Sequence, residues 1–169
     1  TINALIIFFK VMNSISLRLY YGKLLKHFTG QNMITKGIKE LCQEAEREIE
    51  TLNVNDVMLL SENEDTQLID IRDIRELWRD GTIPGSIHAP RGMLEFWIDP
   101  DSPYYKKIFG SGKKFIFYCA GGMRSALAAQ TVHRMGLTPV AHMADGYAGW
   151  VKAGGATESK RPKTSDRRD

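Results

Sequence analysis

One of the two cysteines in this 169-residue chain lies among residues that suit nucleophilic chemistry. Cys119 follows an apolar run over residues 115–118 and precedes Ala-Gly-Gly-Met and then Arg124. Glycines let the backbone curl at little steric cost, so that successive N–H groups can turn inward and hold an anion. The helix predicted over residues 125–135 adds the positive end of its dipole, and Arg124 adds a fixed charge. Together these features favour an ionised thiolate, the nucleophilic form of cysteine.

A less specific interpretation of this pattern stays open from these residues alone. Cys119 would then be a small apolar residue at the end of a strand, and the glycines would serve a tight turn. No histidine stands near the loop in the sequence. That absence fits a nucleophile that is already ionised and needs no neighbouring general base.

The elements around Cys119 alternate between strands and helices. Apolar runs bounded by turn residues predict strands over residues 67–71, 86–89, 114–118 and 139–143. Helices are predicted over residues 57–60, 75–80, 125–135 and 147–152. This alternation is typical of an α/β domain with a parallel sheet. Ligands of such sheets bind beyond the carboxyl ends of the strands, where Cys119 would lie.

The two ends of the chain differ from this domain, which is predicted over residues 52–156. Residues 1–34 show no clean period and are interpreted as an N-terminal extension. Apolar positions spaced by three and four predict an amphipathic helix over residues 35–51, with Cys42 on its apolar face as a buried structural thiol. Residues 157–169 are polar and basic and are predicted to be a disordered tail.

Composition places the chain among ordinary globular proteins. Its hydrophobic fraction is 43%, its charged fraction is 25% and its net charge is only +3, so we expect no nucleic-acid partner. The apolar run over residues 4–9 is too short to span a bilayer, so no membrane association is expected. Two cysteines without a metal-like spacing favour a reducing compartment, and the cytoplasm is the predicted location.

Four segments resemble the signatures of the rhodanese family of sulfurtransferases and occur in that family's order. They are Leu68-Ile69-Asp70-Ile71-Arg72, residues 81–90, the strand and loop that contain Cys119, and residues 145–154. Each segment alone is a weak signal, but together they span most of the predicted domain. The chain therefore resembles a single-domain rhodanese-like sulfurtransferase. This resemblance implies a five-stranded parallel sheet with helices on both faces, preceded here by an N-terminal helical extension.

The resemblance also implies a role for the loop. Cys119 would be the catalytic residue and would carry sulfur as a persulfide. It would take this sulfur from a small anionic donor such as thiosulfate, or from a persulfide-carrying protein, and pass it to cyanide or a thiol. Arg124 would attract the anionic donor. The residues expected to bind substrate are Ala120, Gly121, Gly122, Met123, Arg124 and Ser125. No cofactor and no metal are expected.

Three residues outside the loop are expected to support it. Asp70 and Arg72 are interpreted as an ion pair that braces the loop, with contact between Arg72 and substrate as the alternative. Arg91 follows the second signature and would line the pocket, although a solvated loop arginine fits equally well.

The length of the loop separates the related activities. Four residues lie between Cys119 and Arg124, whereas protein-tyrosine phosphatases and the related dual-specificity phosphatases have five. The longer loop fits a tetrahedral phosphate, so the shorter loop resembles the sulfurtransferase version. A phosphatase and a rhodanese-like module that binds a partner without turnover stay open as alternatives.

Overall fold

The computed structural model describes residues 34–160. The predicted N-terminal extension therefore lies outside the described residues apart from Ile34, as do residues 161–169 of the predicted tail. The first elements in chain order are α3 (Ile38–Glu48), β1 (Glu50–Leu52), α4 (Val54–Ser61), β2 (Thr66–Asp70), α5 (Ile74–Asp80) and β3 (Ile87–His88). They are followed by η1 (Arg91–Met93), α6 (Leu94–Ile98), η2 (Lys107–Gly110), β4 (Lys114–Tyr118), α7 (Met123–Arg134), β5 (Val140–Met143) and α8 (Gly146–Lys152).

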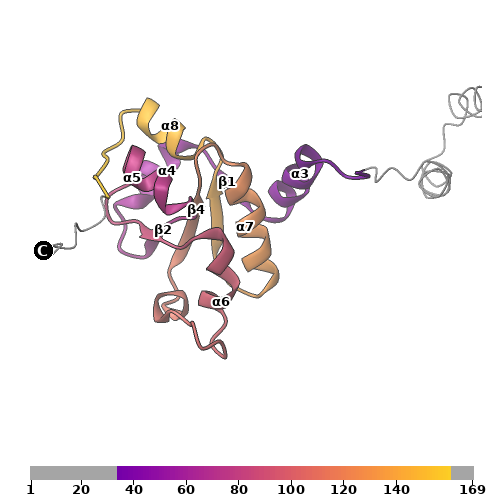
Figure 1. The fold of residues 1–169 in the computed structure, drawn as a ribbon. Coiled ribbons are helices and arrows are strands. Elements are labelled where there is room, and N and C mark those ends of the chain that lie inside the picture. The colour runs from indigo at the N-terminus through magenta and orange to yellow at the C-terminus, as the bar shows by residue number, and fades with distance from the viewer. Residues whose placement is uncertain (1–33, 161–169) are drawn as a thin grey trace, which may run out of the picture. The chain divides into compact units, whose positions relative to one another are not determined.

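The strands form one five-stranded sheet in the order β1-β5-β4-β2-β3. Helices lie on both sides of the strands (Figure 1). Every neighbouring pair is parallel, so the predicted five-stranded parallel sheet is confirmed. The chain adds β3 on one side of β2 and then crosses to place β4 on the other side. Such a reversal is where open parallel sheets bind their ligands, at the carboxyl ends of the strands. Cys119 follows β4, the central strand, at this position.

Alternating side chains divide the core into two apolar layers, one on each face of the sheet. One layer contains Phe115, Phe117 and Cys119 from the β4 segment together with Ala129 and Val132 of α7. The other layer combines residues of β4 and β5 with residues of α4 and α8, among them Ile116, Tyr118, Val57, Met143 and Trp150. Helices thus cover both faces, as the family resemblance implied.

The start of the domain differs from the sequence prediction. The helix predicted over residues 35–51 is shorter, because α3 ends at Glu48 and residues 50–52 form the edge strand β1. Ile49 and Leu52 continue the three-residue apolar spacing of the helix, so the pattern conceals the strand. The parallel pairing of Leu52 with Met143 shows that residues 50–52 form a strand and do not continue the helix. This strand is the fifth member of the sheet, which the apolar runs alone did not predict.

The beginning of the predicted tail is also paired with the domain. Glu158 forms an antiparallel bridge with Thr82, in which each backbone N–H donates to the other residue's carbonyl over 2.9 Å. The prediction of disorder is therefore wrong at Glu158, because main-chain pairing does not depend on the polarity of the side chain.

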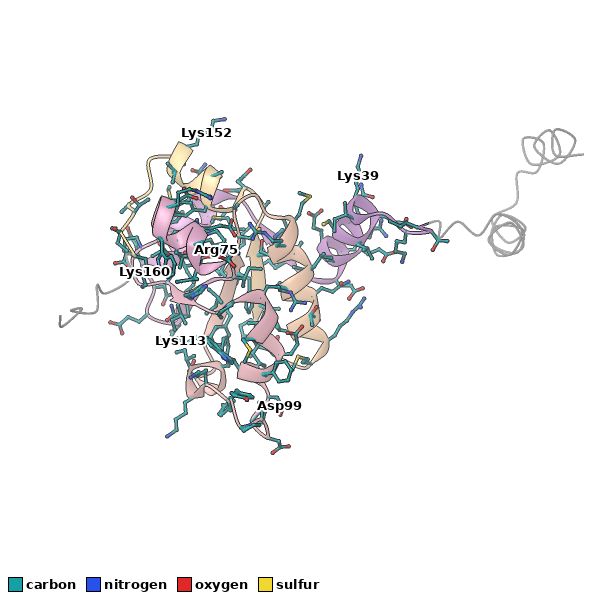
Figure 2. All side chains as sticks on the ribbon, viewed as in Figure 1. Lys39, Arg75, Asp99, Lys113, Lys152 and Lys160 are labelled. Atoms are coloured by element: carbon teal, nitrogen blue, oxygen red, sulfur yellow. The ribbon has the colours of Figure 1, made fainter. Side chains whose placement is uncertain are left out.

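Lys39, Asp99 and Lys152 are among the charged side chains that stand on the outside of the described residues (Figure 2). Within residues 34–160, no helix has the length and apolar character needed to cross a membrane.

Candidate active site

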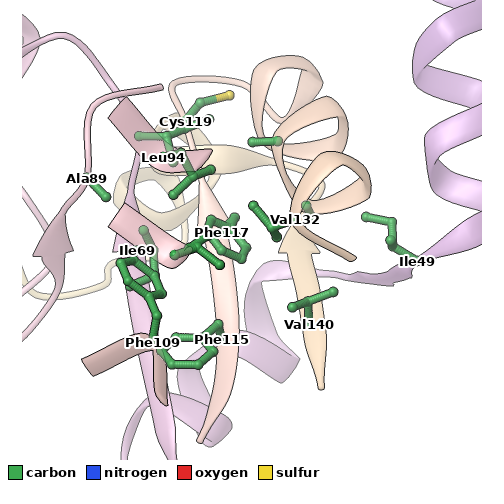
Figure 3. Packing of buried hydrophobic residues seen from close by; sticks show 14 residues of the cluster. Ile49, Ile69, Ala89, Leu94, Phe109, Phe115, Phe117, Cys119, Val132 and Val140 are labelled. Atoms are coloured by element: carbon green, nitrogen blue, oxygen red, sulfur yellow. The ribbon is translucent and has the colours of Figure 1, made fainter. Parts of the chain in front are cut away.

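Cys119 lies at one end of an apolar layer, beside the first turn of α7 (Figure 3). Its residue surface is only 2% exposed, and the thiol is not part of a disulfide. Phe117 and Leu94 lie below it, while Phe109 and Phe115 close the opposite end of the layer. The apolar layer thus fixes the base of the loop, and the polar groups of the site come from the loop and from its neighbours.

Two glycines let the loop and the turn after β5 pack backbone against backbone. Gly122 has φ +91°, and a Cβ at this position would collide with the carbonyl oxygen of Ala144. Gly146 has φ +58°, and its Cβ would lie 2.6 Å from the carbonyl oxygen of Cys119. A side chain at either position would meet rigid backbone in a left-handed conformation, so both positions require glycine.

The first turn of α8 holds the cysteine loop through its backbone. The N–H of Tyr147 donates to the carbonyl of Cys119 over 2.7 Å, and that of Ala148 donates to Ala120 over 3.0 Å. The fourth family-like segment, residues 145–154, therefore bonds directly to the loop that contains Cys119.

The helix that follows the loop begins two residues earlier than predicted, at Met123. Its N-cap is Gly122, and no side chain caps the helix. The buried hydroxyl of Ser125 donates back to the carbonyl of Gly122 over 2.8 Å. A helix start without a side-chain cap leaves N–H groups for a bound anion, in line with the expected role of the loop.

His142 is a site residue that the sequence did not reveal, because it belongs to β5 and lies far from the loop in sequence. Its Nδ1 lies 3.4 Å from the Ser125 hydroxyl, and its Nε2 lies 3.1 Å from the Thr51 hydroxyl. Burial lowers the pKa of His142 below its ordinary value of 6.5, so the ring is neutral at neutral pH. His142 therefore links Ser125, in the first turn of α7, to Thr51 of β1 as a neutral hydrogen-bonding group.

Arg124 is paired with a carboxylate from another helix. Its Nη1 and Nη2 donate to the two carboxylate oxygens of Glu76 on α5, over 2.7 and 2.8 Å. Hydrogen bonds to Glu76 raise the pKa of Arg124, and Cys119 is among the other groups that raise it. The guanidinium is thus within electrostatic reach of the thiol. The fixed charge that the sequence predicted at Arg124 already has a counter-ion in Glu76.

Asp70 and Arg72 form a buried pair at the carboxyl end of β2. Arg72 is 1% exposed, and it donates to both carboxylate oxygens of Asp70 and to the carbonyl of Gly81. Its guanidinium lies 4.0 Å from the ring centre of Tyr147, whose N–H holds Cys119. Burial alone would lower the pKa of Arg72, but the hydrogen bonds and charge of Asp70 outweigh it and leave the pKa raised. The pair therefore reaches the loop through Tyr147, and Arg72 also lies 5.8 Å from the ring centre of Tyr118, the residue before Cys119.

Arg91 is not placed at the loop. Its side chain donates to Glu95 over 2.7 Å and to Thr131 over 3.4 Å. Thr131 is eight residues beyond Met123 on α7, which corresponds to about 12 Å along the helix axis. Arg91 therefore ties α6 to the middle of α7, and the prediction that it lines the pocket is not supported by these contacts.

Cys42 is buried on α3, as its place on the apolar face predicted. Its thiol donates to the carbonyl of Met123 over 3.7 Å, so α3 contacts the first residue of α7. Burial, together with the charges of Glu46 and Cys119, raises the pKa of Cys42. This thiol is therefore protonated and poorly nucleophilic at neutral pH.

Two further features of residues 34–160 concern places where a metal ion or a ligand could bind. No group of three or more His, Cys, Asp or Glu side chains there could hold a metal ion. A cavity of about 390 Å³ lies near the amino end of β2, with Gln67, Pro84 and Trp150 among its lining residues. Cys119 is not among the residues that line it.

The fold has solved relatives. A protein of unknown function and possible tyrosine phosphatase from Rhodopseudomonas palustris is 56% identical, with a TM-score of 0.73 over 76% of this chain and 98% of its own. A thiosulfate sulfurtransferase from Pseudomonas aeruginosa is 28% identical, with a TM-score of 0.55 over 70% of this chain and 22% of its own. A homodimeric polysulfide-sulfur transferase from Wolinella succinogenes is 25% identical, with a TM-score of 0.56 over 76% of this chain and 91% of its own.

Sequence comparisons agree with the fold. A mouse (Mus musculus) relative, thiosulfate sulfurtransferase/rhodanese-like domain-containing protein 3, is 30% identical over 97 residues. The match covers 54% of this chain and 62% of that relative. The family model of the rhodanese-like domain matches residues 53–153, which include the loop after β4 and the turn that holds it. The chain therefore belongs to the rhodanese-like domain family.

Proposed function

We propose that the chain is a sulfurtransferase that moves a sulfane sulfur from a donor to an acceptor through a persulfide on Cys119. The observation that carries this proposal is the position of the thiol. Cys119 lies at the carboxyl end of the central strand, in front of a helix start that no side chain caps. Peptide N–H groups and the helix dipole favour negative charge at such a place, first on the thiolate and then on the outer persulfide sulfur.

The cycle needs two substitutions at sulfur. With thiosulfate, the Cys119 thiolate attacks the outer sulfur, the S–S bond of the donor breaks and sulfite leaves with the electron pair. Cyanide then attacks the outer sulfur of the Cys119 persulfide, which gives thiocyanate and restores the thiolate. Loop residues from Ala120 to Ser125, Arg124 among them, hold the substrate in this scheme.

The names of two structural relatives support sulfur transfer. They are a thiosulfate sulfurtransferase and a polysulfide-sulfur transferase, both at 25% identity or more. The donor of this chain is accordingly a small sulfur compound of that kind or a persulfide carried by a protein.

The test is the intact mass of the protein after incubation with thiosulfate or polysulfide. We expect a gain of one sulfur atom, located on Cys119 by peptide mapping and removed by cyanide. Cys119→Ser should not gain the sulfur, whereas Cys42→Ser should gain it like the wild type. Cys42→Ser is a matched control, because serine keeps a donor for the Met123 carbonyl. A wild-type protein that gains no sulfur from either donor would contradict the proposal.

A phosphatase is the second candidate, because the relative from Rhodopseudomonas palustris is named as a possible tyrosine phosphatase and is 56% identical. The four-residue spacing between Cys119 and Arg124 argues against it, since the phosphatase loops that this site resembles have five. Turnover of p-nitrophenyl phosphate that is lost in Cys119→Ser would favour the phosphatase.

A further inference from the structure

The carboxylate that faces the loop comes from a helix 48 residues away in sequence. Glu76 accepts from both terminal nitrogens of Arg124, so the two planar groups meet edge to edge through two hydrogen bonds. This two-point geometry is the strongest form of an arginine–carboxylate contact. An anionic substrate that approaches Arg124 therefore meets a guanidinium that already holds a counter-ion.

Glu76 is held in place from the opposite side as well. Its Oε2 also accepts from the backbone N–H of Asp73 over 3.0 Å, while the Asp73 side chain accepts from the N–H of Arg75. This capping box starts α5 and fixes the Glu76 side chain, which is only 20% exposed. Hydrogen bonding to Arg124 lowers the pKa of Glu76, so the carboxylate is ionised at neutral pH. The negative charge is thus a permanent part of the site.

The second arginine that acts on Glu76 is itself paired with a carboxylate. Arg72 contributes to the low pKa of Glu76, but its own charge is balanced by Asp70. Ala120, Gly121, Gly122 and Met123 between the cysteine and Arg124 carry no charge. The loop therefore adds no charge of its own beyond that of Arg124, and its N–H groups and the helix dipole favour negative charge at Cys119.

We propose that Glu76 sets the donor specificity of the site: by neutralising Arg124, its carboxylate selects the persulfide of a thiol over the thiosulfate dianion. This assignment rests on the sulfurtransferase function proposed above. With a persulfide donor, the Cys119 thiolate attacks the outer sulfur of R–S–SH, the donor S–S bond breaks, and R–S⁻ leaves. That step brings a neutral or singly charged donor to the thiolate, whereas thiosulfate brings two negative charges to it.

Glu76→Gln tests the assignment with little change in structure. Glutamine can still accept from the Asp73 N–H and complete the capping box, but it has no charge to neutralise Arg124. The matched control is Glu95→Gln, which removes the same charge from the Arg91–Glu95 pair. The donors are thiosulfate and the persulfide of 2-mercaptoethanol, which has no charge beyond its sulfur, and cyanide is the acceptor for both.

We expect Glu76→Gln to raise kcat/KM for thiosulfate by roughly three- to tenfold, mainly through a lower KM, because the freed guanidinium attracts the anion. The value for the persulfide should change by less than about twofold, and Glu95→Gln should leave both values unchanged. Added salt should depress the thiosulfate rate of Glu76→Gln more steeply than that of the wild type.

Equal changes with both donors, or no change with thiosulfate, would overturn the assignment. The wild type gives a second test that does not depend on the folding of a variant: its kcat/KM for the persulfide must exceed that for thiosulfate, and the reverse order would also overturn it. Failure of the sulfurtransferase function itself looks different, because neither donor would then load Cys119 in the wild type.

Discussion

The carboxyl edge of the sheet holds two arginine–carboxylate pairs that look alike in distance and differ in burial. Arg72 meets Asp70 and Arg124 meets Glu76, each with a shortest N–O distance of 2.7 Å. Arg72 is 1% exposed, whereas Arg124 is 45% exposed. Water can replace the partner of an exposed ion, but a buried ion has only the protein to balance it. We therefore expect the buried pair to contribute to stability, whereas the exposed pair is the one to which we assign donor specificity.

The contacts around the two pairs follow this division. The buried pair joins β2, the turn at Gly81 and the ring of Tyr147, so several segments depend on one guanidinium. Thr82 adds a hydroxyl donor to the Asp70 carboxylate. The exposed pair joins two helix starts, α5 and α7, next to the thiol. It can be broken without uncovering the core.

The sharpest way to break the comparison is to remove the buried guanidinium. Arg72→Met would leave the Asp70 charge without its cation in the interior, and we expect a loss of about 3–5 kcal/mol in the free energy of unfolding. Urea unfolding followed by circular dichroism measures it. The double variant Asp70→Asn/Arg72→Met should lose less than the sum of the single variants. A loss below about 1 kcal/mol for Arg72→Met would place this pair in the same class as the exposed one.

A smaller loss is expected from the backbone of the loop. Gly122→Ala puts a side chain in a left-handed conformation and against the carbonyl of Ala144, and it should cost at least about 1–3 kcal/mol. Gly121→Ala is the control, because a Cβ there meets no atom within 4 Å. Equal losses in the two variants would show that the close approach to Ala144 does not constrain the loop.

Lowering the pH should gradually reduce the stability of the protein through His142, which contacts Ser125 at the start of α7. Burial holds the pKa of His142 below its ordinary value of 6.5. Below pH 6.5 the unfolded chain therefore binds a proton at this residue more readily than the folded protein does. This contribution to stability is complete above pH 6.5 and is lost as the pH falls toward the folded-state pKa. The melting temperature measured from pH 7.5 to pH 5 should fall less in His142→Gln than in the wild type. His133→Gln, at an exposed position of α7, should follow the wild type.

The smallest effect on stability is expected at the exposed pair. Arg124→Met should change the free energy of unfolding by about 0–1 kcal/mol, because water solvates the released Glu76 carboxylate. Urea unfolding in parallel with Arg72→Met gives the direct comparison. A loss of several kcal/mol would mean that Arg124 supports the fold as Arg72 does, and the contrast between the pairs would fail.

Local patterns were enough to predict the strand, loop and helix around Cys119. The strand over residues 114–118 agrees with β4, and the loop and helix follow as expected, because an apolar run and a pair of glycines are signals within one short stretch. The parallel sheet followed from the alternation of elements. The strand, the loop, the helix and their alternation are all determined by residues close together in the sequence, so they can be predicted from it.

Partners that are distant in the chain could not be predicted in this way. Glu76 looked like an ordinary residue of a short helix, and nothing in its neighbourhood in the sequence indicates that it meets Arg124. His142 has an apolar strand around it, and its contact with Ser125 exists only because β5 lies beside β4. Strand β1 has three residues and shares the apolar spacing of the helix before it, so its pairing with β5 is visible only in three dimensions.

The position of β1 has a practical consequence for shortened versions of the protein. The matched family region starts at residue 53, after this strand, yet β1 covers the edge of β5. A chain cut at residue 53 would expose the unpaired N–H and C=O groups of β5, whose residues are all buried in the complete sheet. An uncovered, apolar strand edge is a template for pairing with other chains, so such a fragment should aggregate unless the cut is made before α3.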